Sequence, residues 1–181
     1  MTIDEIYSKT ASHMIEGIMV HEQLANYYDF LNLHGYKRCH EYHYLCESKY
    51  FRKLNRYFVN HHEKLIPESK VENPEIIPAS WYDYKREDVS STDIRNAVKT
   101  GMEKWVSWER ETKILYETMF KEAMTIGEVA SAKKICKFIK CVDHELKMAE
   151  RYMLKLKAID YDLGFITSEQ KWIHNKYKAK L

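Results

Sequence analysis

The sequence predicts an all-α domain, a long four-helix bundle followed by a short C-terminal helix. Three observations predict it. The chain of 181 residues has only five glycines and three prolines, too few turn-forming residues for a β-rich fold. Long segments carry apolar side chains at helical spacing, as Val98, Trp105 and Met119 do. All three prolines fall between residues 65 and 90, so long helices before and after that stretch are uninterrupted.

The first half of the chain predicts two antiparallel helices. The first is expected over residues 3–32 and is ended by His34-Gly35, because glycine readily adopts the left-handed conformation of a helix terminus. The second is expected over residues 37–62 and is rich in aromatic side chains. Since only a few residues connect the two helices, they must lie antiparallel to each other.

The second half begins with a long connection, residues 65–90, which contains the prolines. Such a connection is explained if the second and third helices run parallel, because the chain must then cross the full length of the bundle. The third and fourth helices are expected over residues 92–124 and 128–159. After a turn through Gly164, Ser168 is expected to cap a last helix over residues 168–179. We interpret residues 1–181 as a single domain.

Composition excludes several classes of function. The net charge of +2 is too balanced to indicate nucleic-acid binding. There is no signal-peptide pattern and no apolar run of membrane-spanning length, so we expect a cytoplasmic protein without membrane contact. The four cysteines form no Cys-x-x-Cys pair and are expected to be reduced. Five glycines also argue against a phosphate-binding loop.

The chemistry indicated by the sequence is metal binding. Each long helix has an acidic residue near its middle, on or beside the apolar stripe: Glu22, Glu47, Glu109 and Glu145. Buried carboxylates are costly unless they find a partner or a metal ion. His43 lies four residues before Glu47 and can face the same point. Carboxylate and imidazole ligands suit iron or manganese, so these five residues are the candidate metal ligands.

Two of these acids lie in segments that resemble the ferritin-like superfamily. The stretch from His21 to Tyr28 is similar to the first ferritin helix around its iron-ligand glutamate, which corresponds to Glu22. The stretch from Trp108 to Lys113 resembles the third-helix segment around another ligand, which corresponds to Glu109. The spacing from Glu109 to the fourth helix then matches Glu145 to a third ligand. The resemblance implies a ferritin-like bundle that binds iron, oxidises Fe(II) as a ferroxidase-like oxidoreductase or stores iron, and forms a homo-oligomer.

The sequence also departs from the ferritin pattern. Ferritins carry Glu-x-x-His on the second helix, but here Glu47 is followed by Tyr50 at the histidine position, and Glu145 is followed by Met148. A looser resemblance to the starvation-induced mini-ferritins covers His34-Gly35 and residues 42–52. The alternative function is therefore a metal-free ferritin-like scaffold with a structural or interaction role.

One further pair of histidines ends the second predicted helix. His61 and His62 are interpreted as capping residues, because cations are favourable near a helix C-terminus. Metal binding by this pair is the alternative interpretation.

Overall fold

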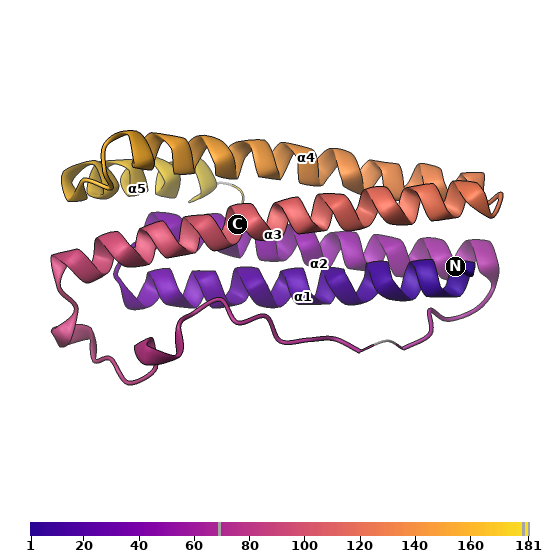
Figure 1. Ribbon diagram of the computed structural model, residues 1–181, viewed down its shortest axis with the longest axis horizontal. Coiled ribbons are helices and arrows are strands. Elements are labelled where there is room, and N and C mark those ends of the chain that lie inside the picture. Colours follow the sequence, from indigo (N-terminus) through magenta and orange to yellow (C-terminus); the bar gives the residue numbers. More distant parts are fainter. Residues whose placement is uncertain (69, 179, 181) are drawn as a thin grey trace.

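The computed structural model describes residues 1–68, 70–178 and 180. In this part of the chain there are five α-helices and two short 3-10 helices (Figure 1). The α-helices are α1 (Ile3–Phe30), α2 (His34–His62), α3 (Ser91–Thr125), α4 (Val129–Ala158) and α5 (Leu163–Lys178), and the 3-10 helices are η1 (Ala79–Trp81) and η2 (Arg86–Asp88). None of the described helices is both long and apolar enough to cross a membrane.

Helices α1 and α2 form an antiparallel hairpin, as the sequence predicts. Thr2 begins α1 with a capping box, in which its side chain accepts the Glu5 N–H and the Glu5 carboxylate accepts the Thr2 N–H. The helix ends at Phe30, and Asn32, with φ of 57°, takes the left-handed conformation of the turn. The expectation that Gly35 supplies this residue is wrong, because Gly35 lies within the first turn of α2.

The segment between α2 and α3 is the crossover predicted from the prolines. It runs along the length of the bundle beside α1, so α2 and α3 are parallel (Figure 1). Gln23 in the middle of α1 holds it by donating hydrogen bonds to Asn73 Oδ1 at 2.9 Å and Pro74 O at 2.8 Å. Arg86 then donates to Phe30 O at 3.0 Å. This contact satisfies a carbonyl at the end of α1, whose last turn has no basic residue.

Helices α3 and α4 form the second antiparallel hairpin. Ser90 is the N-cap of α3 and forms a capping box with Asp93, so the helix begins within a residue of the predicted position. Gly127, with φ of 82°, makes the turn before α4.

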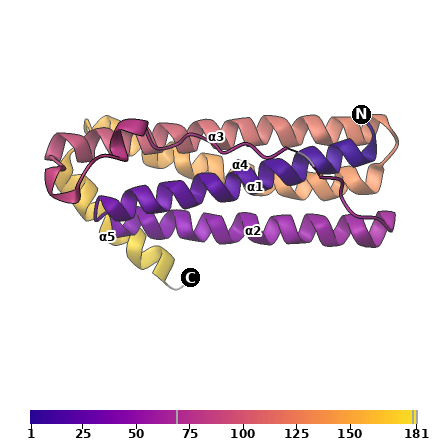
Figure 2. The same cartoon turned by 90° about the horizontal axis from the view of Figure 1, so that it is seen from below.

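Helix α5 packs across the end of the bundle against α2 (Figure 2). It begins at Leu163, five residues before the predicted start, because Asp162 Oδ1 accepts the Phe165 N–H at 2.9 Å and caps the helix there. Ser168 is an exposed residue inside α5 and not its cap. The buried Tyr36 hydroxyl donates to Glu169 Oε2 at 3.2 Å and ties α5 to α2.

The interior of the bundle contains two separate apolar clusters. One includes Met14, Leu54 and Tyr116 toward the N-terminal end of α1. The other includes Leu24 and Trp105 and continues under α5. A band of buried polar side chains separates them midway along the long helices. The middle of the core is therefore the part in which buried polar side chains from the four long helices meet.

Candidate metal centre

Six titratable side chains from the four long helices make up this band, which we call the buried polar cluster. None has more than 5% of its surface exposed. The cluster consists of His21 on α1, His40, His43 and Glu47 on α2, Glu109 on α3 and Glu145 on α4. The spacing on α2 explains its three members, since residues three and four apart share one helix face.

Glu109 is the most extensively contacted carboxylate of the cluster. The Trp105 indole N–H, one turn earlier on α3, donates to Glu109 Oε1 at 3.0 Å. His21 Nε2 lies 3.5 Å from the same oxygen. On the other side of its ring, His21 Nδ1 lies 3.1 Å from His40 Nδ1. These contacts connect α1, α2 and α3 through one chain of polar atoms.

His43 and Glu145 connect α2 to α4. His43 Nδ1 lies 3.5 Å from Glu145 Oε2. Within the described part of the chain neither atom makes a hydrogen bond, and His43 Nε2 also has none. His21 Nε2 and His40 Nε2 are equally without hydrogen-bond partners. A buried polar atom without a partner costs about 1–3 kcal/mol. So many unpartnered donor and acceptor atoms in one place indicate a site built for a ligand that binds nitrogen and oxygen.

Burial favours the neutral forms of Glu47, Glu145 and His43. It raises the pKa of Glu47 well above the usual value, and the carboxyls of Glu145 and Glu109 add to the rise. Burial also raises the pKa of Glu145 to about 7, although His21 and His144 oppose this. For His43, burial lowers the pKa to about 4. A bound cation would reverse the preference of the two carboxyls, because it stabilises carboxylates, and it would keep His43 neutral, because an imidazole that ligates a metal must be unprotonated.

A pocket of about 320 Å³ leads from the surface to His43 and Glu145 between α2, α4 and α5. Its wall includes Cys46, Tyr50 and Cys141, and three lysines lie at it, Lys140, Lys176 and Lys180. Both cysteines are free thiols. The pocket gives small molecules and ions a route to one side of the cluster.

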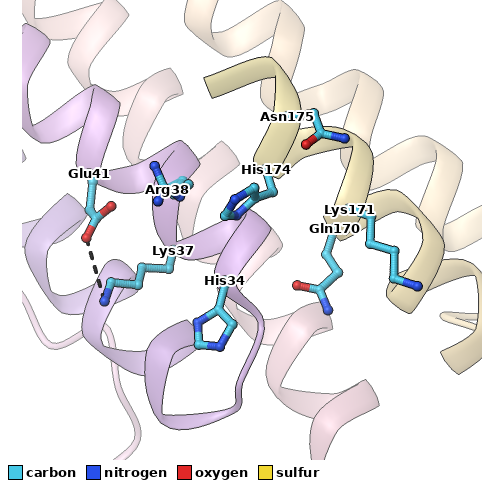
Figure 3. Close-up of a pocket in the computed structure, with 8 residues that line it drawn as sticks. All are labelled: His34, Lys37, Arg38, Glu41, Gln170, Lys171, His174 and Asn175. Atoms are coloured by element: carbon cyan, nitrogen blue, oxygen red, sulfur yellow. Dashed lines mark ion pairs between the residues drawn. The ribbon is translucent and has the colours of Figure 1, made fainter. Parts of the chain in front are cut away.

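A second pocket, of about 510 Å³, lies between the beginning of α2 and α5 (Figure 3). Its lining is polar and includes three cationic side chains, those of Lys37, Arg38 and Lys171. Lys37 also pairs with Glu41 at 3.7 Å. This pocket contains no member of the buried polar cluster, so it is not part of the candidate metal centre.

The structure brings together four of the five residues predicted from the sequence, His43, Glu47, Glu109 and Glu145. Glu22 is not among them, since its side chain is exposed and lies 3.5 Å from Asn26 Nδ2 on the outer face of α1. The preceding residue, His21, faces the cluster instead. His40 was not predicted as a ligand either, although it lies three residues before His43 on the same helical stripe.

Solved structures similar to this fold were found, whereas the sequence matches no protein-family model and no curated protein. An engineered closed form of the Archaeoglobus fulgidus ferritin aligns with a TM-score of 0.76 and 16% identity, over 96% of both chains. The open-pore ferritin of the same archaeon aligns with a TM-score of 0.75 and 17% identity, over 93% of this chain and 92% of that one.

The chain has the ferritin-like fold. An iron-soaked crystal structure of a PmFTN variant supports this, with a TM-score of 0.74 and 12% identity over 92% of this chain and 95% of that one. The predicted ferritin-like bundle, with its crossover and fifth helix, is confirmed. At these identities the similarity concerns the ferritin-like fold alone.

Proposed function

We propose that this ferritin-like protein binds Fe(II) at the buried polar cluster and oxidises it with dioxygen. The observation that carries the proposal is the convergence of three buried carboxyls and three imidazoles from four helices. Five of their atoms have no hydrogen-bond partner among the residues that the structure describes. Oxygen and imidazole donors suit iron, and manganese as the second choice. The ferritin-like fold, and the iron-soaked PmFTN variant that shares it, make iron the first metal to test.

In this proposal Glu47, Glu109, Glu145 and His43 are ligands. His21 lies between Glu109 and His40 and either joins them or positions Glu109. Glu47 and Glu145 lose their protons when Fe(II) binds. Two Fe(II) ions then give one electron each to one dioxygen molecule, which takes up two protons and leaves as hydrogen peroxide, and the two irons become Fe(III). Tyr116 lies close enough to the cluster to act as an electron donor, because burial and then the cluster's three carboxyls raise its pKa. Its buried hydroxyl has no hydrogen-bond partner among the described residues.

A metal-free scaffold is the second candidate, and one observation favours it. Among the residues that the structure describes, the members of the buried polar cluster do not bring three ligand atoms within 4.8 Å of one another. Their side chains would have to rotate toward an ion. The missing Glu-x-x-His motifs, with Tyr50 and Met148 at the histidine positions, agree with this alternative.

Anaerobic addition of Fe(II) followed by air distinguishes the two functions. We expect the wild type to produce ferric absorbance faster than protein-free buffer, and the double variant Glu109→Ala/Glu145→Ala to lose this acceleration. Glu22→Gln is the matched control, because it changes an exposed acid beside His21, and it should behave as the wild type does. Equal rates for the wild type, the double variant and buffer would favour the metal-free scaffold.

We also propose that the protein forms a homo-oligomer. Several large apolar side chains on the long helices are exposed, including Ile114 at 64% and Leu154 at 60%. Contacts between copies would remove such side chains from water.

A further inference from the structure

Three side chains at the far end of the bundle form a compact group of potential metal ligands. His61 and His62 end α2, and Glu128 immediately precedes α4. One ligand atom from each lies within 4.8 Å of the other two. Among the described residues, no other group of three or more histidine, cysteine or acidic side chains has its ligand atoms this close together. We call it the terminal triad.

The terminal triad is separate from the buried polar cluster. His43 and His61 are both on α2, 18 positions apart, which corresponds to about 27 Å along an α-helix. His61 is exposed, and His62 and Glu128 are half-buried, so the group can be reached directly from solvent. An ion bound here would not share ligands with the cluster.

Packing already fixes both imidazole rings. The His61 ring stacks on Tyr57 at 5.2 Å between centroids, one turn earlier on α2. The His62 ring packs on Phe58 at 4.8 Å. Because the rings are held in place, less side-chain entropy is lost when an ion binds than for freely rotating histidines.

Ser131 orients the carboxylate of the triad. Its buried hydroxyl donates to Glu128 Oε2 at 3.3 Å and lies 3.3 Å from His62 Nε2. Polar groups that hold metal ligands in this way raise the affinity of metal sites. Of the nearby lysines, Lys64 is paired with Asp4 at 2.6 Å, and Lys134 lies over the Tyr57 ring.

We propose that the terminal triad is a site for a divalent transition-metal ion of the zinc type. Two imidazoles and one carboxylate are a common set of three protein ligands for zinc, and they leave a fourth position open to water. The negative end of the α2 dipole favours a cation beside His61 and His62, and the positive end of α4 favours the carboxylate of Glu128. The site is independent of Fe(II) binding in the core.

Competition for Zn²⁺ with a chromogenic chelator tests the site. We expect the wild type to bind one Zn²⁺ more tightly than His61→Ala and Glu128→Gln do, by at least tenfold for each variant. His34→Ala is the matched control, since His34 is an exposed helical histidine at the opposite end of α2. Glu109→Gln should also keep this Zn²⁺, because Glu109 belongs to the buried polar cluster.

Unchanged Zn²⁺ affinity in both His61→Ala and Glu128→Gln would overturn the proposal and leave helix capping as the role of the two histidines. Both variants alter residues with exposed surface and should keep the helical circular dichroism of the wild type. A His62→Ala variant would also lose the packing of His62 on Phe58 and could unfold. The test therefore rests on His61→Ala and Glu128→Gln. Zn²⁺ should also raise the melting temperature of the wild type by more than that of Glu128→Gln.

Discussion

Burial changes the pKa values of His43 and Glu145 in the buried polar cluster more than the neighbouring charges do. His43 and Glu145 lie 3.5 Å apart, a distance at which an ion pair could form. Burial is nevertheless the largest cause both of the lowered pKa of His43 and of the raised pKa of Glu145. Without a cation, the pair is therefore more stable as a neutral acid beside a neutral imidazole.

Replacing Glu145 with glutamine should stabilise the metal-free protein at pH 7 and above. Burial raises the pKa of Glu145 from 4.5 to about 7. A raised folded-state pKa gives stability that is present below pH 4.5 and is lost as the pH rises through 7. From this group the wild type should lose up to roughly 3 kcal/mol of unfolding free energy between pH 4 and 8, and Glu145→Gln should not. Urea denaturation across this range measures the difference, and a difference between the two proteins that does not change with pH would contradict it.

His13 should produce the opposite pH dependence. Its ring stacks on Trp108 at 4.4 Å, and its Nε2 lies 2.7 Å from Thr112 Oγ1. Burial lowers its pKa from 6.5 to about 4, so this histidine gives stability above pH 6.5 that is lost as the pH falls through 4. The loss should reach up to about 3 kcal/mol. Titration followed by NMR measures the pKa directly, and a His13 pKa above 6 would refute the prediction.

At the scale of the elements, the position of α5 depends on the absence of a side chain on α2. A Cβ at Gly35 would lie 1.8 Å from Gln170 O and 2.5 Å from Gln170 C, both backbone atoms of α5. The Gly35 N–H also donates to the Gln170 side chain at 3.2 Å. Backbone atoms cannot rotate away as a flexible side chain can, so any larger residue must displace α5.

Gly35→Ala is therefore expected to lower the free energy of unfolding by on the order of 3 kcal/mol. It should also widen the pocket between α2, α4 and α5 that leads to His43 and Glu145. Gly17→Ala is the matched control, since Gly17 is also buried and helical but its Cβ would make ordinary contacts of 3.5 Å or more. That change should be neutral or stabilising by about 1 kcal/mol. Equal stability of the two variants in thermal or urea unfolding would show that α5 adjusts freely.

Much of the fold could be predicted because the helices carry strong local signals. The apolar repeats set the long helices to within three residues of their ends. The start of α5 was missed because Asp162 and Ser168 are both good caps. The role of Gly35 was missed because close packing of a distant helix leaves no local pattern, whereas a glycine between two helices has the pattern of a helix terminus.

The sequence predicted residues of the candidate site on three helices and missed the one on α1 by a single position. Acids on an apolar stripe indicated Glu47, Glu109 and Glu145, because carboxyls are rarely buried without a function. On α1 the same reasoning chose Glu22, but neighbouring residues on a helix point about 100° apart, and His21 is the one that faces inward. An amphipathic stripe is too broad to separate two adjacent polar residues by sequence alone.

For the whole molecule, the exposed apolar side chains on the long helices lead us to expect a homo-oligomer. Light scattering after size exclusion should give a mass that is a multiple of the 21.8 kDa chain. Ile114→Lys should shift the distribution to smaller species if α3 lies in a contact, because the charge would have to lose its water. Thr118→Lys, one turn further along α3 and also exposed, is the control for added charge at the same helix. A monomer of the wild type at micromolar concentration would argue against assembly.

The crossover along α1 divides the chain into two helical hairpins, and contacts within such hairpins are close in sequence and form early in folding. Neither hairpin holds the whole centre, because His43 and Glu47 come from the first and Glu109 and Glu145 from the second. Their side chains lose water only when the hairpins dock. Metal affinity should therefore appear at docking, after the helical signal has developed. A chain nicked within the crossover should keep its metal only while the two halves stay associated.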